Sequence, residues 1–178
     1  MNKKYLLILL LPFFYCIQSC NNQQRSNNNN QDTTIIDKAG LSFIKNVDEL
    51  SQAEIKAATI AESTSKSPEV VNFAHKLINE YNNSLQKLQD IKAKASITAT
   101  DEISQAHKKL IDSIAKLPGA QFDRAYMKLA VDNSGKLTVL YVNASQDKSQ
   151  VVSTYARKIM PALQIQLDSA RKISASLK

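Results

Sequence analysis

Residues 67–95 read SPEVVNFAHKLINEYNNSLQKLQDIKAKA, a pattern typical of one long helix. Ser67 suits the N-cap position, Pro68 suits the first helical position, and Glu69 places an acid in the first turn. Apolar side chains recur at helical spacing along one stripe, which comprises Val70, Ala74, Leu77, Tyr81, Leu88 and Ile91. Such a stripe predicts a helix that packs against other helices through one face.

The same periodicity on both sides of this segment predicts an all-α chain. Further helices are expected at about 41–65, 101–116, 121–145 and 148–176. Their buried stripes are expected to hold Ile44, Val47, Ile55, Ala58, Ile60, Ile103, Leu110, Ile111, Ile114, Phe122, Tyr126, Leu129, Leu137, Tyr141, Val152, Tyr155, Ile159, Leu163 and Ile173. Four long helices and one short helix predict a four-helix bundle with an additional short helix.

A few residues mark the expected helix ends and interruptions. Thr100 is expected to cap the short helix, which should end at Leu117-Pro118-Gly119. Pro161 removes one hydrogen bond inside the last helix and should kink that helix. Residues 137–142 also fit the alternation of a strand, but they fit the helical stripe equally well.

Two segments far apart in the chain resemble each other. Residues 73–78 (FAHKLI) and 155–160 (YARKIM) share their apolar and basic positions, and each follows a valine pair. Two similar helical hairpins joined by a short helix would produce this echo. The general similarity of amphipathic helices would also produce it, so both explanations stay open.

The N-terminus has the features of a bacterial lipoprotein signal peptide. Lys3 and Lys4 precede an apolar run over residues 5–17, and Cys20 follows that run closely. We expect cleavage after residues 1–19, which leaves Cys20 as a lipid-bearing N-terminus. An ordinary signal peptide with an incidental cysteine is the alternative, whereas an uncleaved anchor is disfavoured because the run is short for a bilayer.

Residues 20–38 are expected to be a disordered tether between the lipid and a helical domain at residues 39–178. Residues 21–34 contain no apolar side chain, so they cannot bury enough surface to offset the entropy of ordering. A tether of this length holds the domain about 20 Å from the lipid. Asn21 is not the aspartate that retains lipoproteins in the inner membrane of enteric bacteria, which predicts the outer membrane, facing the periplasm.

The charge pattern bears on partners. The formal net charge is +7, and removal of residues 1–19 takes away Lys3 and Lys4 but no acid. The remaining lysines are spread along the chain, without the clustered basic and aromatic residues of a nucleic-acid surface. We therefore expect no nucleic-acid partner. The expected partners are the membrane, through the lipid, and a protein or cell-wall component of the envelope.

No pattern for catalysis or for a cofactor stands out. A di-iron bundle needs Glu-x-x-His pairs, but Asn72 precedes His75 by three residues and Ser104 precedes His107 by three. Both histidines are expected at the surface or its boundary. The chain also has no Gly-x-Ser-x-Gly elbow and no glycine-rich phosphate loop. The sequence predicts no enzyme, no cofactor and no metal ligands.

Polar residues on or beside the core stripes form the candidate site. They comprise Glu54, Glu80, Tyr81, Tyr126, Asn133, Ser134 and Gln166, with Tyr141 and Tyr155 nearby in the pattern. Buried polar groups need hydrogen-bond partners, so these side chains are expected to meet in an interior polar cluster. Such a cluster is either a small polar pocket between helices or a purely structural network.

Four segments also carry a family resemblance. Glu54-Ile55, residues 70–81, Phe122–Met127 (FDRAYM) and Pro161 resemble an exported bacterial family known as domain of unknown function 4142. The likeness covers about residues 39–177 and is sharpest at Phe122–Met127. It implies a ferritin-like four-helix bundle in the cell envelope, with no established activity.

The resemblance also implies a difference from the relatives. Members often carry histidine near the ends of matching core stripes, at the positions of Tyr81, Ser134 and about Gln166 in this chain. If those histidines bind metal, this chain lacks the ligands. The sequence therefore predicts an envelope lipoprotein that binds or interacts without catalysis. The alternative is a ferritin-like metal-binding or oxidative-stress protein with a degenerate metal site.

Overall fold

The computed structural model describes residues 35–98 and 102–177, which form five helices and, within these ranges, no strand. The helices are α1 (Lys38–Thr64), α2 (Pro68–Lys94), α3 (Gln105–Ile114), α4 (Gly119–Ala144) and α5 (Gln150–Ser176). The predicted all-α bundle is confirmed, and residues 137–142 belong to α4. The predicted signal peptide, Cys20 and the tether up to residue 34 lie outside the described residues.

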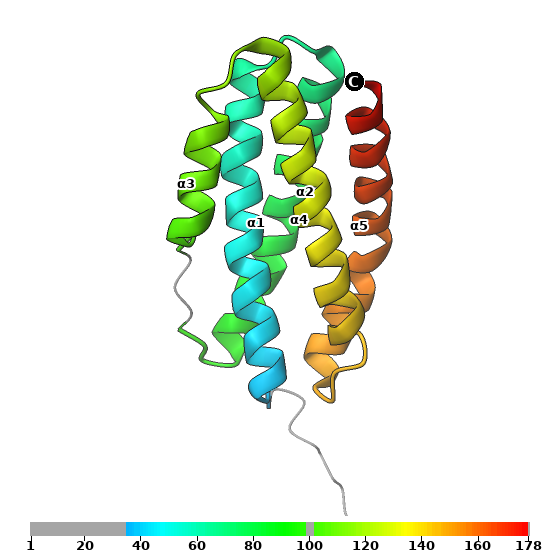
Figure 1. Cartoon of the computed structure of the whole chain (residues 1–178). Helices are drawn as coiled ribbons and strands as arrows, with labels where there is room; N and C mark the ends of the chain where they lie inside the picture. The colour runs from blue at the N-terminus through cyan, green and yellow to red at the C-terminus, as the bar shows by residue number, and fades with distance from the viewer. Residues whose placement is uncertain (1–34, 99–101, 178) are drawn as a thin grey trace, which may run out of the picture. The chain divides into compact units, whose positions relative to one another are not determined.

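The four long helices form a bundle, in which each packs against two neighbours. α1 packs against α2 and α4, and α5 packs against α4 and α2. α1 and α5 run in one direction, and α2 and α4 run in the other (Figure 1). A single long connection containing α3 joins the end of α2 to the start of α4, which is the ferritin-like arrangement of a four-helix bundle. α3 packs across α1 and α4.

Side-chain caps define three of the helix starts. The Asp37 carboxylate accepts from the Gly40 amide at 2.9 Å and caps α1. The Ser67 hydroxyl accepts from the Val70 amide at 3.4 Å and caps α2, as its sequence predicts. Ser104 caps α3, so the short helix begins at Gln105, later than expected. Thr100, the expected cap, lies outside the described residues.

Most residues of the predicted stripes line one core, but Leu110 is an exception. Leu110 is 44% exposed, because α3 lies on the bundle surface and only its Ile111 side is buried. Ile103 precedes α3 yet still packs against the core. Lys92, which belongs to no predicted stripe, is nevertheless buried. Leu110 lies where its helix has fewer neighbours than the apolar pattern indicates, and Lys92 lies where its helix has more.

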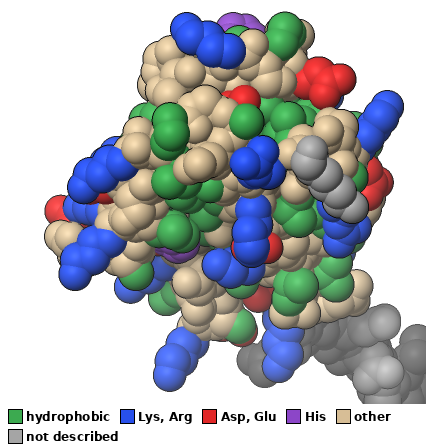
Figure 2. All heavy atoms as spheres, turned by 45° about the horizontal axis from the view of Figure 1, so that its top comes forward, with side chains coloured by type: hydrophobic (Ala, Val, Ile, Leu, Met, Phe, Trp, Pro, Cys, Tyr) green, Lys and Arg blue, Asp and Glu red, His purple; other side chains and the backbone are tan. Residues whose placement is uncertain are grey.

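The remaining surface is mixed in character. Figure 2 shows Lys and Arg side chains scattered over the viewed face, among hydrophobic and uncharged polar side chains. Pro161 lies inside α5, and the kink expected there stays a prediction. In the part of the chain that the structure describes, no helix combines the length and hydrophobicity needed to cross a membrane.

Candidate functional site

Glu54 is the centre of the candidate site. Its carboxylate lies in the middle of the bundle, where α1 faces α4, and it is fully buried. The Asn133 side-chain amide donates to Glu54 Oε1 at 2.6 Å, and Lys136 Nζ donates to Asn133 Oδ1 at 3.4 Å. Burial raises the pKa of Glu54 to about 7, although the Asn133 hydrogen bond and the Lys136 charge oppose the rise. Glu54 is therefore poised to change charge near neutral pH.

A second hydrogen-bonded set joins the other three helices. The Gln166 amide on α5 donates to the Tyr81 hydroxyl on α2 at 2.6 Å and to Ser134 Oγ on α4 at 3.1 Å. Burial, and next the charge of Glu54, hold the pKa of Tyr81 well above its ordinary value. The electrostatic effect of Glu54 on Tyr81 ties this set to the first one.

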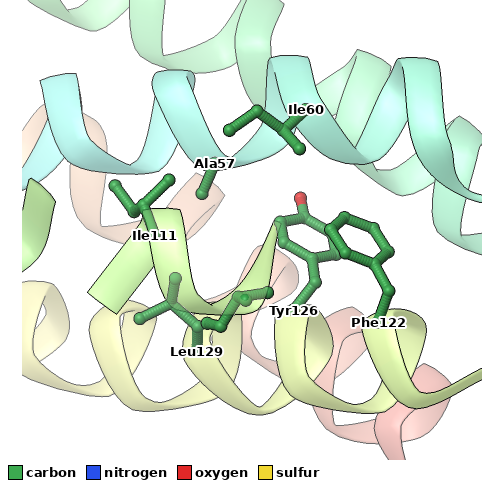
Figure 3. Close-up of a pocket in the computed structure, with 7 residues that line it drawn as sticks. Ala57, Ile60, Ile111, Phe122, Tyr126 and Leu129 are labelled. Carbon is green, nitrogen blue, oxygen red and sulfur yellow. The ribbon is translucent and has the colours of Figure 1, made fainter. Parts of the chain in front are cut away.

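Tyr126 completes the interior polar cluster, but its hydroxyl has no partner. Figure 3 shows the hydroxyl pointing toward α1, between Ala57 and Ile60, where the lining of a small hollow is otherwise apolar. Tyr126 OH and Glu54 Oε2 are both buried without a hydrogen-bond partner among the described residues. Burial and the nearby Glu54 charge raise the Tyr126 pKa well above its ordinary value.

Six of the seven predicted site residues thus lie together, and Glu80 does not join them. The interior polar cluster consists of Glu54, Tyr81, Tyr126, Asn133, Ser134 and Gln166. Glu80 lies one position before Tyr81, faces outward and forms an ion pair with Lys76 at 3.7 Å. It lies instead at the mouth of a cavity of about 240 Å³, whose inner wall includes Tyr81 and Gln166.

This cavity connects the cluster to the surface between α2 and α5. Lys87 and Lys158 stand at its rim, and Ile159 and Leu163 supply apolar walls. The hydrogen bonds around Gln166 therefore lie at the edge of a space open to solvent, whereas Glu54 lies deeper. The arrangement can bind a group that enters between the two helices, and it offers hydroxyl and amide groups at the bottom.

The comparisons with known proteins place the chain in a family. The sequence model of the family described as Domain of unknown function (DUF4142) matches residues 23–173. The chain belongs to that family. No curated protein and no solved structure matches it.

The contacts of Gln166 bear on whether this member of the DUF4142 family could hold a metal at the same place. Tyr81, Ser134 and Gln166, which lie at or near the positions where we expect histidines in relatives, meet within hydrogen-bond distance here. Their two hydroxyls and one side-chain amide include no imidazole nitrogen and no carboxylate, the ligands of zinc and di-iron sites. Across residues 35–98 and 102–177, no three or more His, Cys, Asp or Glu residues gather into a possible metal site.

The two histidines of this DUF4142 domain lie away from the interior polar cluster. His75 Nδ1 lies 2.7 Å from Glu62 Oε1 on the exposed surface. His107 Nδ1 lies 2.7 Å from Glu49 Oε1 and 3.2 Å from Ser104 Oγ. Burial alone would raise the pKa of Glu49, but the hydrogen bonds from His107 and Ser104 outweigh it and lower the value. Both histidines therefore connect helices at the surface.

A second interior network was only partly foreseen from the sequence. Ser84 Oγ lies 2.8 Å from the Tyr155 hydroxyl, which lies 3.0 Å from the Tyr141 hydroxyl. Tyr155 also donates to the Ser84 carbonyl at 3.2 Å. Burial raises the pKa of both tyrosines. Ser84 went unrecognised, although it lies three residues after Tyr81 on the same stripe.

A buried ion pair between α1 and α2 was missed altogether. Lys92 Nζ lies 2.5 Å from Asp48 Oδ2, and both side chains are almost completely buried. Asp48 follows Ile44 by four residues and Lys92 follows Leu88 by four, so each lies on a core stripe. That spacing was the available signal. The pair fixes the register of α1 against α2 but lies outside the cavity lining.

Proposed function

We propose that this member of the DUF4142 family is a lipid-anchored lipoprotein of the bacterial cell envelope, which acts as a non-enzymatic binding module. The anchor is supported by the order of basic residues, apolar run and Cys20 at the N-terminus. The binding role rests on one structural observation, the cavity of about 240 Å³ between α2 and α5 that reaches the interior polar cluster. The bundle then faces the periplasm, held by its lipid.

The side-chain contacts support binding rather than catalysis. Ser134 shares its hydrogen bond with the Gln166 amide, which cannot act as a base. His75 and His107 pair with surface glutamates. Glu54, the carboxylate of the interior polar cluster, bonds to Asn133. In the described residues, no nucleophile therefore lies beside a general base at this cavity.

The alternative, a ferritin-like metal-binding or oxidative-stress protein, has weaker support. Its ligands would come from Tyr81, Ser134 and Gln166, whose side chains include no imidazole nitrogen and no carboxylate for a zinc or di-iron site. Elemental analysis of the processed protein should find no stoichiometric iron, zinc or manganese. Stoichiometric metal that is lost on Glu54→Ala or Glu80→Ala would overturn the binding-module proposal.

Acylation at Cys20 is the first experiment. Cells that express the full chain are labelled with a radioactive fatty acid and fractionated. The wild-type protein should be processed, labelled and membrane-bound, whereas Cys20→Ser should remain unprocessed or mislocalised. Cys16→Ser is the matched control and should keep the label, because Cys16 lies inside the predicted signal peptide. Mature, correctly located and unlabelled Cys20→Ser protein would refute the lipid anchor.

Separation of inner and outer membranes by density tests the location. We expect the processed protein to fractionate with the outer membrane, since Asn21 follows the acylated cysteine. An Asn21→Asp variant should shift toward the inner membrane if this organism follows the enteric rule. Wild-type protein in the inner membrane would contradict the outer-membrane assignment alone and leave the anchor intact.

A further inference from the structure

A longitudinal groove follows the seam between α2 and α5. Besides the cavity of about 240 Å³, a second hollow of about 400 Å³ lies farther along the same two antiparallel helices. Glu69 on α2 and Ser176 on α5 meet at the far end of that second hollow, where the Ser176 hydroxyl lies 3.4 Å from Glu69 Oε2. We call the two hollows together the α2/α5 groove. Its floor and rims are defined by Phe73, Lys76, Lys87, Lys158, Lys172 and Ile173.

The groove combines an apolar floor with basic rims. Phe73 and Leu163 are almost completely buried, and Ile159 and Ile173 are partly buried along the floor. Four exposed lysines stand above them, two on each helix. The glutamates among the lining residues are Glu69 and Glu80, and Glu80 forms an ion pair with Lys76. The rims therefore carry an excess of positive charge along the groove's length.

The opposite seam of the bundle, between α1 and α4, shows how a helix packs over such a seam. α3 lies across α1 and α4, and Ile111 and Ile114 pack toward Ala57 and Phe122. Under α3 this packing leaves a hollow of only about 10 Å³ (Figure 3), whereas a hollow of about 440 Å³ remains on the same seam beside the start of α3, between Glu49 and Val139. An amphipathic helix thus fills the part of a seam that it covers, and the part that it does not reach stays open. The α2/α5 seam is bounded by the same kind of antiparallel helices, but no helix of the described residues covers it.

We propose that the α2/α5 groove binds an amphipathic helix of a partner protein, with acidic side chains on both sides of its apolar stripe. The apolar stripe would lie on the floor, and the acids would pair with the lysines of the two rims. This partner class deepens the proposed function and rests on it.

Other occupants match the groove less well. Residues 21–34 of the chain itself contain no apolar side chain for the floor. A second copy that presented the same groove would bring like-charged rims together. A fatty acid or other single-headed amphiphile would use one pair of lysines, whereas Lys76 and Lys87 lie about 16 Å apart along α2 at 1.5 Å per residue. An elongated partner with repeated acids uses both pairs.

The test uses two synthetic helical peptides of about five turns. Both carry the same leucine stripe, and they differ only in flanking residues, which are all Glu or all Lys. The processed protein, with its lipid, is titrated in detergent into each fluorescent peptide, and the fluorescence anisotropy of the peptide is measured. We expect the Glu peptide to bind about tenfold more tightly than the Lys peptide and to weaken as salt rises.

Charge reversal on the protein provides the decisive comparison. The double variant Lys87→Glu/Lys158→Glu should reverse the preference and favour the Lys peptide. A matched double variant, Lys45→Glu/Lys109→Glu, changes the net charge equally but lies outside the groove and should keep the wild-type preference. Equal effects of the two double variants would mean that only net charge matters, which would overturn the proposal.

The floor is tested on one helix with two isoleucines. Ile173→Asn should abolish binding of the Glu peptide, whereas Ile165→Asn, at a position that is 58% exposed outside the groove, should not. Displacement of the peptide by oleate at lower concentration than by excess peptide would identify an amphiphile site and refute the helix.

The lipid anchor and the helix-binding groove can be refuted independently of each other. If the Glu peptide does not bind while Cys20-dependent membrane attachment holds, the helix inference is wrong and the anchored lipoprotein stands. If the peptide binds with the expected charge preference but attachment does not need Cys20, the anchor is wrong and the groove stands.

Discussion

The two opposite seams of this bundle have the same construction and different coverings. α3 covers one part of the α1/α4 seam, the closed side, and leaves a hollow of about 10 Å³ there. The part of that seam beyond the start of α3 keeps a hollow of about 440 Å³, and the α2/α5 seam keeps hollows of about 400 and 240 Å³. The interior polar cluster spans the space between them. Its Glu54 end lies on the closed side, and its Gln166 end lines the open groove. The comparison indicates that a seam of this bundle is closed where a helix packs over it and open where none does.

Two phenylalanines provide the largest expected contrast. Phe122 lies on the part of the α1/α4 seam that α3 covers, and Phe73 lies on the groove floor. Phe122→Ala should lower the free energy of unfolding by about 4 kcal/mol, because it leaves a closed apolar cavity. Phe73→Ala should cost about half as much, since the space it leaves joins an existing groove. Urea unfolding with unchanged m-values measures both, and equal losses would contradict the distinction between the seams.

Glu54 should make stability depend on pH. Its pKa rises from 4.5 to about 7 on folding, so the ionised form is disfavoured in the folded state. The protonated form carries no such cost below about pH 4.5. Stability should fall as pH rises from about 4.5 to about 7 and then level off, by about 3 kcal/mol in total.

Glu54→Gln is the variant that isolates this effect. Glutamine stays neutral and can still accept from Asn133, so the variant should be more stable than wild type at pH 8 and similar at pH 4. Urea midpoints across this range measure the difference. Glu80→Gln at the groove mouth is the matched control and should keep the wild-type pH dependence, because Glu80 is partly exposed. A Glu54→Gln profile that parallels wild type would show that Glu54 stays ionised or hydrated on the closed side.

The sequence predicted the helices and their apolar stripes far better than it predicted which helices would pack against each other. Asn133, Ser134 and Gln166 were identifiable as polar residues among apolar ones, because helical spacing alone places them on a core stripe. Which of them would face Glu54 depends on the order of helices around the bundle, and a single helix does not encode that order.

The charged core residues illustrate the same limit. Lys92 looks like a surface lysine from its own helix, but it is buried and pairs with Asp48 on another helix. Leu110 looks like a core residue, yet α3 has neighbours on one side only. The groove itself was not foreseeable, since it depends on which seam α3 covers.

The two ends of the interior polar cluster should respond differently to loss of an amide. Asn133→Ala removes the hydrogen bond to Glu54 Oε1 on the closed side and should cost about 2–3 kcal/mol at pH 8, because a buried charge loses its donor. Gln166→Ala removes two hydrogen bonds but should cost only about 1 kcal/mol, since water in the groove can replace them. Chemical denaturation of both variants sharpens the comparison. A larger loss for Gln166→Ala would indicate that its end of the cluster is closed to water.

The smallest expected effect concerns the attachment of α3, which closes its seam. His107 bonds to Glu49 and so ties the start of α3 to α1. Because the pKa of Glu49 is lowered, this contribution is present at neutral pH and is lost as pH falls through the pKa of Glu49 in the folded protein. His107→Ala should reduce global stability by only about 0.5 kcal/mol, because the pair is partly exposed. Hydrogen exchange of the α3 amides should nevertheless accelerate several-fold, since α3 can then open locally.

His75→Ala is the matched control, because it removes an equally short pair with Glu62 that lies between α1 and α2. It should leave exchange in α3 unchanged. If both variants accelerate α3 equally, the His107 pair does not hold the helix, and the packing of Ile111 and Ile114 alone closes the part of the α1/α4 seam that α3 covers. That outcome would make the contrast between the seams purely apolar in origin, with the polar attachments at the surface contributing nothing to it.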